Sequence, residues 1–178
     1  MRKVTLHNKT FEVFISDTEI AEIVHSISNQ INNSGVKDPL FIAVMNGVFL
    51  FAADVMRKIT ISNAEISFIK LSSYEGTETT GKVDELIGVS DDISGRNIIV
   101  LEDIIDTGIT LEKIISLLKK EEVADIKVAT LLFKPDAYTK DIHIDFIGKS
   151  IPNDFVVGYG LDFDEIGRNL PHIYKLKN

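Results

Sequence analysis

The segment that most constrains the fold is residues 98–111, Ile-Ile-Val-Leu-Glu-Asp-Ile-Ile-Asp-Thr-Gly-Ile-Thr-Leu. Its four leading apolar residues follow the turn residues Ser94, Gly95 and Asn97, which predicts a strand over 98–101 buried on both faces. Next comes an acidic pair, Glu102 and Asp103. A turn of small and hydroxyl residues and then a helical pattern follow it. Ligands bind at the carboxyl ends of strands in parallel α/β sheets. This segment therefore predicts the centre of a binding site.

The residues after the predicted strand are suited to a ligand with a phosphate and a diol. Glu102 and Asp103 match sugar hydroxyls or a hard cation such as Mg²⁺. Asp106 is a candidate general base. The turn at 107–110 offers two hydroxyls, a glycine and free amides at a helix start, which suit a phosphate monoester. The alternative is an acidic helix cap beside solvated charges.

Strands and helices alternate through the middle of the chain, which predicts an α/β fold with a mostly parallel sheet. Ser16 and Glu19 form a capping box for a first helix, which Gly35 ends. The other expected elements are a strand or hairpin at 2–15, helices at 48–59 and 111–121, and strands at 40–45, 66–71, 83–89, 126–133, 144–147 and 155–158. The length, 178 residues, fits one domain spanning 1–178.

Composition narrows the class of protein. The net charge of −8 disfavours non-specific nucleic-acid binding, and with no cysteine the chain has no disulfide or thiolate chemistry. Residues 40–53 are uncharged but fall short of the ~20 apolar residues that a membrane helix needs. The N-terminus has no apolar core typical of a signal peptide. We therefore expect a cytoplasmic protein that binds neither membrane nor nucleic acid.

Residues 100–110 resemble the phosphoribosyl-pyrophosphate (PRPP) signature of type I phosphoribosyltransferases. Further segments resemble hypoxanthine-guanine phosphoribosyltransferases, in the same order along the chain. They are a pyrophosphate loop at 44–47, a flexible catalytic loop opening with Ser73 and Tyr74, and purine and pyrophosphate sites at Lys134, 155–162 and Arg168. The resemblance implies a mostly parallel central sheet flanked by helices, with a small hood built from the terminal segments.

The resemblance also implies an activity. The enzyme is expected to transfer the 5-phosphoribosyl group of PRPP to a 6-oxopurine, hypoxanthine and also guanine, and to release IMP or GMP and pyrophosphate. This is a reaction of purine salvage that depends on Mg²⁺. A homodimer or homotetramer is expected, with helix 48–59 as a possible interface. The alternatives are a transferase that prefers xanthine or a pyrimidine, and a non-catalytic PRPP-binding regulator.

On the PRPP side, the resemblance assigns each residue of the turn a role. Asp106 is implied as the catalytic base, beside N7 of the purine. Glu102 and Asp103 are implied to hold the ribose hydroxyls and Mg²⁺. The 5′-phosphate is implied to bind Thr107, Gly108, Ile109 and Thr110, and pyrophosphate to bind Asn46, Gly47, Ser73, Tyr74 and Arg168.

On the purine side, Lys134 is implied to donate to the 6-oxygen, which fits an ammonium because it carries donors only and rejects a 6-amino group. Phe155 is implied to stack on the base, and the Val156 backbone to contact its N1 and O6 edge. Asp162 is implied to bind a second Mg²⁺, with its backbone at position 2. Read alone, Phe155 is equally consistent with a core residue.

Two residues depart from the family pattern. Asn46 stands where the pyrophosphate loop often carries lysine, so that position can donate a hydrogen bond but brings no charge. Ile109 replaces the lysine common in the phosphate turn, where only the backbone is needed. The family also implies a cis peptide bond in the pyrophosphate loop, and we place it between Met45 and Asn46 because Gly47 leaves room.

Overall fold

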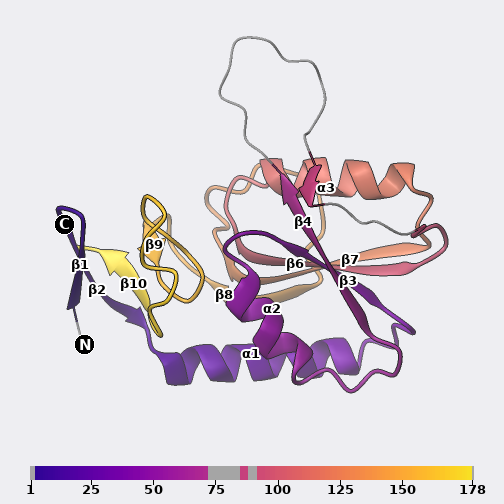
Figure 1. Cartoon of the computed structure of the whole chain (residues 1–178), viewed down its shortest axis with the longest axis horizontal. Helices are drawn as coiled ribbons and strands as arrows, with labels where there is room; N and C mark the ends of the chain where they lie inside the picture. Colours follow the sequence, from indigo (N-terminus) through magenta and orange to yellow (C-terminus); the bar gives the residue numbers. More distant parts are fainter. Residues whose placement is uncertain (1–2, 72–84, 88–91, 178) are drawn as a thin grey trace, which may run out of the picture.

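A six-stranded sheet in the order β5-β4-β3-β6-β7-β8 forms the centre of the molecule, as the computed structural model shows for residues 3–71, 85–87 and 92–177 (Figure 1). The parallel strands are β3 (Leu40–Val44), β4 (Glu65–Leu71), β6 (Asn97–Ile105), β7 (Asp125–Phe133) and β8 (Phe146–Ser150). The short edge strand β5 (Glu85–Ile87) runs antiparallel to β4. The predicted α/β fold with a mostly parallel sheet is confirmed.

Helices cover both faces of this sheet (Figure 1). Helices α1 (Asp17–Asn32) and α2 (Phe49–Met56) lie on one face, and α3 (Ile109–Lys120) lies on the other. Because side chains alternate along a strand, Phe41 in β3 packs in the α1 and α2 layer, while its neighbour Ile42 packs in the α3 layer. The central strands are therefore buried on both faces, which explains why they consist almost entirely of apolar residues.

Helix α1 begins where its capping residues predict. The Ser16 hydroxyl accepts the Glu19 N–H at 3.1 Å, which satisfies one of the free donors of the first turn. Ile20, Val24 and Ile27 follow at helical spacing and are buried against the sheet. The amphipathic pattern therefore fixes which face of the helix meets the core.

A second, antiparallel sheet of four strands forms the hood, and both chain termini lie there (Figure 1). Its strands, in spatial order, are β1 (Lys3–Leu6), β2 (Lys9–Ile15), β10 (Ile173–Leu176) and β9 (Val156–Val157). Phe11, Val157 and Tyr174 form its own small core. The predicted hood from the terminal segments is thus confirmed.

One predicted boundary was wrong where it matters for the site. The central strand does not end at Leu101 but continues to Ile105, because its ladder with β7 extends to the pair Ile105 and Phe133. Glu102 and Asp103 therefore lie within β6, not after it. Strand β8 also begins at Phe146, two residues later than expected. None of the helices formed by the described residues has the length and apolar character needed to cross a membrane.

Candidate active site

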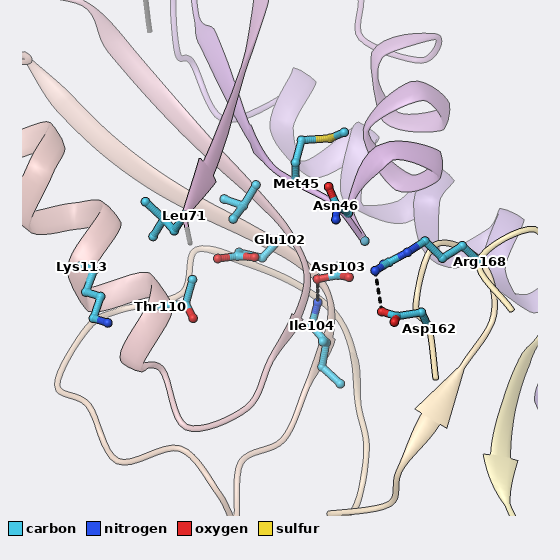
Figure 2. A pocket seen from close by; sticks show the side chains of 12 residues that line it. Met45, Asn46, Leu71, Glu102, Asp103, Ile104, Thr110, Lys113, Asp162 and Arg168 are labelled. Carbon is cyan, nitrogen blue, oxygen red and sulfur yellow. Dashed lines mark hydrogen bonds and ion pairs between the residues drawn. The ribbon is translucent and has the colours of Figure 1, made fainter. Parts of the chain in front are cut away.

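A cavity of about 380 Å³ opens at the carboxyl ends of β3, β4 and β6, between the start of α3 and the loop that follows β9 (Figure 2). It is lined by Val44, Met45, Asn46, Gly47, Leu71, Glu102, Asp103, Ile104, Thr110, Lys113, Asp162 and Arg168. The cavity thus joins segments from the first third, the middle and the end of the chain. Its position is the one at which parallel sheets bind ligands.

The acidic pair occupies the middle of this cavity. Adjacent strand residues point to opposite sides, so Glu102 faces Thr110 and Leu71 while Asp103 faces Arg168 (Figure 2). Burial, together with the charge of Asp103, raises the pKa of Glu102 well above the usual range. Burial also raises the pKa of Asp103 from 3.8 to about 6, although the hydrogen bond from the Ile104 N–H at 2.8 Å opposes the rise.

A smaller cavity of about 100 Å³ lies over the turn between β6 and α3, and its lining runs from Ile104 to Leu111, together with Glu102. Gly108 has a φ of +83°, and a Cβ there would lie 2.5 Å from the Tyr138 ring. Glycine is therefore required both by backbone conformation and by space. The N-cap residue of α3, Gly108, has no side chain to cap the helix, and the Ile109 N–H donates to the Thr107 hydroxyl at a long 3.5 Å. The first turn of α3 is therefore suited to an anion. Thr110 lines both cavities.

Asp106 and Lys134 form an ion pair beside this turn, with 2.8 Å between Lys134 Nζ and Asp106 Oδ2. They follow neighbouring parallel strands, β6 and β7, and the Lys134 N–H donates to the Ile105 carbonyl at 3.0 Å. The Lys134 side chain is only 10% exposed, whereas the Asp106 side chain is 44% exposed. The lysine is therefore held in place, and its partner faces solvent.

The pyrophosphate-loop segment contains the expected cis peptide bond between Met45 and Asn46. Gly47 packs so closely on Asp103 that any Cβ would collide with the carboxylate. From the other side, Gly160 approaches the Gly47 carbonyl oxygen, with which a Cβ at 160 would likewise collide, and its φ of +101° also favours glycine. Two glycines thus let three segments meet at one point.

The loop after β9 is tied to this meeting point by polar contacts. Arg168 pairs with Asp162 at 2.7 Å and donates to the Gly160 carbonyl at 2.9 Å. The Tyr159 hydroxyl donates to Asp54 Oδ2 in α2 at 2.7 Å, and burial raises the pKa of Tyr159 above its usual range. Asp162 and Arg168 consequently face the cavity from a loop fixed at two points.

Comparison with known proteins agrees with this geometry. Residues 15–164 match the family model of the phosphoribosyl transferase domain. The chain is 36% identical to the hypoxanthine-guanine phosphoribosyltransferase of Staphylococcus aureus over 174 residues, 97% of each protein. It is 38% identical to that of Streptococcus pneumoniae, covering 97% of this chain and 96% of the relative.

The chain belongs to the phosphoribosyltransferase family.

Solved structures show the same fold. A hypoxanthine-guanine phosphoribosyltransferase from Bacillus anthracis, with a HEPES molecule in its active site, superposes with a TM-score of 0.84 at 39% identity, covering 94% of this chain and 97% of the other. A hypoxanthine phosphoribosyltransferase from Staphylococcus aureus gives a TM-score of 0.84 at 36% identity, covering 93% of this chain and 91% of the other. The type I phosphoribosyltransferase fold predicted from the signature is confirmed.

In this phosphoribosyltransferase, most of the candidate residues are brought to one edge of the sheet. The candidate residues that line the larger cavity are Asn46, Gly47, Glu102, Asp103, Thr110, Asp162 and Arg168. Those that line the smaller cavity are Glu102, Asp106, Thr107, Gly108, Ile109 and Thr110. Ser73 and Tyr74 lie outside the described residues.

Phe155 and Val156 lie in the hood and line neither cavity. Val156 is buried in β9, whereas Phe155 is 48% exposed and contacts Phe163 and Phe11, with ring centroids 5.8 and 6.3 Å apart. Phe155 is therefore not a buried core residue, because about half of its surface is accessible to solvent.

The predicted metal ligands do not form a closed site. Among residues 3–71, 85–87 and 92–177, no three histidine or carboxylate side chains converge on one point. Asp162 is paired with Arg168, which leaves Glu102 and Asp103 as the two adjacent carboxylates in the cavity. This arrangement fits Mg²⁺, which is usually held by one or two carboxylates together with substrate phosphates.

Sequence reasoning missed two kinds of contributor. Lys113 lines the larger cavity. Its position one helical turn after Thr110 places both side chains on the same face of a helix, and this spacing could have indicated it from the sequence. Tyr159, Gly160 and Asp54 position the loop that carries Arg168. No local pattern marks them, because their partners lie far away along the chain.

Proposed function

We propose that this chain transfers the 5-phosphoribosyl group of PRPP to hypoxanthine and to guanine, giving IMP or GMP and pyrophosphate. The observation that carries the proposal is the ion pair of Lys134 and Asp106, 2.8 Å apart beside the phosphate turn. N7 and O6 lie next to each other on one edge of a 6-oxopurine. Two adjacent side chains, one a donor and one an acceptor, match that edge.

The recognition of the base follows from the chemistry of this pair. Lys134 can only donate, so it favours a 6-oxygen and repels the 6-amino group of adenine. Asp106, ionised, accepts from N7–H of the incoming base. Because Lys134 is buried and held through its backbone by Ile105, its ammonium has little freedom to turn away. The exposed ring of Phe155 is a stacking surface for the purine, and Val156 follows it with backbone groups for the N1 and O6 edge.

The phosphate-binding half is assigned on the same basis. The turn from Thr107 to Thr110 would hold the 5′-phosphate through N–H and hydroxyl donors. Glu102 and Asp103 would hold the ribose hydroxyls and a Mg²⁺ ion, whose charge offsets that of the pyrophosphate group when bound. Pyrophosphate would lie between Asn46, Gly47 and Arg168 at the other end of the cavity. A second Mg²⁺ at Asp162 would share that carboxylate with Arg168, which contacts one of its two oxygens.

The reaction breaks the bond from C1 of the ribose to the pyrophosphate oxygen and forms a bond from C1 to N9 of the base. The electron pair of the broken bond leaves with pyrophosphate, and Asp106 takes the proton from N7. Arg168 lines the cavity, where it would face the departing group and stabilise its growing negative charge. Such electrostatic preorganisation commonly supplies a large part of catalysis. Ser73 and Tyr74, which would cover the reacting groups, belong to the proposal on the basis of sequence alone.

A panel of bases tests the proposal. Hypoxanthine, guanine, xanthine, adenine and uracil are each incubated with PRPP and Mg²⁺, and the nucleotide formed is measured. We expect IMP and GMP, with at least about a hundredfold less product from adenine, because one misplaced buried donor costs ~3 kcal/mol. Product from no base would refute the activity, and product from xanthine or uracil alone would favour the alternative transferases.

Two further properties complete the proposal. We infer that the protein acts in the cytoplasm and assembles as a homodimer or homotetramer. Phe49 in α2 is 38% exposed and is a candidate contact between copies. Light scattering coupled to size-exclusion chromatography measures the mass in solution, and a monomeric mass at working concentration would contradict the assembly.

A further inference from the structure

Lys113 is a cationic residue of the larger cavity to which no role has been assigned. It lies near the start of α3, three residues after Thr110, and both side chains line the cavity. Long side chains on a helix point back toward its N-terminus. The ammonium group is accordingly directed to the Thr110 side of the cavity (Figure 2).

Other basic groups near the site already have acidic partners. Arg168 pairs with Asp162 at 2.7 Å, Lys134 with Asp106 at 2.8 Å, and Lys140 with Glu112 at 2.7 Å. For Lys113, the part of the chain that the structure describes provides no ion pair. An ammonium group without an acidic partner, in a cavity that shares Thr110 with the phosphate turn, is suited to an anionic ligand.

The position of Lys113 identifies which end of the ligand it meets. Lys113 and Thr110 lie on one side of the acidic pair, whereas Asp162 and Arg168 lie on the other (Figure 2). Thr110 also lines the small cavity over the phosphate turn. Within that turn, residue 109 is an isoleucine, 50% exposed, and so brings no charge to a bound phosphate.

We propose that Lys113 binds the 5′-phosphate of PRPP and of the nucleotide product. Lys113 supplies, from a position near the start of α3, the positive charge that residues 106–110 lack. The proposal rests on the proposed function for the identity of the ligands. Backbone N–H groups and the Thr107 and Thr110 hydroxyls would fix the phosphate geometrically, while Lys113 adds a charge-assisted contact. Pyrophosphate, at the far end, is outside its reach.

Binding of three ligands to four proteins tests this assignment. Calorimetry in Mg²⁺-free buffer measures the affinity of IMP, ribose 5-phosphate and pyrophosphate for the wild type, Lys113→Gln, Lys113→Arg and Lys120→Gln. Lys120 is exposed in the last turn of the same helix, so its substitution makes the same change in net charge away from the site. We expect Lys113→Gln to lower the affinity for IMP and for ribose 5-phosphate about fivefold to tenfold. Its affinity for pyrophosphate should fall less than about twofold.

The controls separate the possible outcomes. Lys113→Arg should keep IMP affinity within about threefold of the wild type, and Lys120→Gln within about twofold. Three results would overturn the assignment. Lys113→Gln and Lys120→Gln could lose the same affinity for IMP, or Lys113→Gln could keep its full affinity for IMP and ribose 5-phosphate. Lys113→Gln could also lose as much affinity for pyrophosphate as for these two ligands. If the wild type fails to bind IMP, the proposed function fails. The role of Lys113 is then still tested by whether Lys113→Gln loses more affinity for ribose 5-phosphate than for pyrophosphate.

Discussion

The phosphate turn and the junction beneath the hood are built in opposite ways. The turn is one continuous piece of chain, residues 106–110, whose shape follows from a strand end, one glycine and a helix start. The junction is defined by Asp54, Gly47, Tyr159, Gly160 and Arg168, and its hydrogen bond from Tyr159 to Asp54 joins residues 105 positions apart. Local sequence therefore determines the turn, whereas tertiary packing determines the junction.

This difference predicts different consequences of substitution. A change in the turn removes a chemical group from a frame that the strand and helix still hold in place. A change in the junction leaves every chemical group present but alters the distance between Arg168 and the loop at Gly47. The first kind should lower kcat, and the second should weaken the binding of ligands that span both segments.

The largest effect is expected for Asp106→Asn in the turn. Loss of the proton acceptor should lower kcat by about a hundredfold or more, since general base catalysis commonly contributes this much. The KM for PRPP should change less than about threefold, because the turn keeps its shape. Steady-state kinetics with hypoxanthine measure both values.

Asp136→Asn is the matched control, since Asp136 is an exposed carboxylate two residues beyond Lys134. It should retain nearly full turnover. A wild-type kcat in Asp106→Asn would show that Asp106 is not the base. It would also contradict the expectation that substitutions in the turn lower kcat.

The second largest effect is expected for Gly160→Ala in the junction. The new Cβ would collide with the Gly47 carbonyl oxygen and push the loop bearing Arg168 away from the pyrophosphate loop. We expect the affinity for pyrophosphate to fall about tenfold or more, with the affinity for ribose 5-phosphate, bound at the turn, less affected. Calorimetry measures both affinities.

Gly95→Ala separates the effect of the collision from that of backbone strain. Gly95 also has a positive φ, +70°, but a Cβ there meets open space. Both variants should lose about 1 kcal/mol of stability from the strained backbone, whereas only Gly160→Ala should lose pyrophosphate affinity. Equal affinities in the two variants would show that the junction does not position Arg168.

The same difference explains how much could be predicted from the sequence. The turn, the fold and the capped start of α1 were predictable because local patterns mark each of them. Strand β6 extends past Leu101 through two carboxylates because pairing with β7 continues, which no local pattern reveals. The contact of Tyr159 with Asp54 was missed for the same reason. Lys113 was missed because helical spacing alone does not tell which side chains reach a cavity.

The smallest effect is expected at Asp103, where the two regions meet. Its carboxylate contacts Gly47 on one side and faces Arg168 on the other. Burial raises its pKa from 3.8 to about 6, so the ionised form is less favourable in the folded protein than in the unfolded chain. That destabilisation is complete above about pH 6, shrinks as the pH falls and vanishes below the unfolded pKa of 3.8.

Asp103→Asn removes the charge but keeps an oxygen that can accept the Ile104 N–H. In Mg²⁺-free buffer near pH 8 we expect the variant to be more stable than the wild type by about 1 to 2 kcal/mol, a rise in Tm of roughly 2 to 8 °C. The difference should disappear as the pH approaches about 4. Thermal unfolding at several pH values measures it, with Asp136→Asn as the exposed reference. A variant that is less stable than the wild type near pH 8 would mean that contacts of the ionised carboxylate hold the junction together, and that its charge stabilises the fold even without ligand.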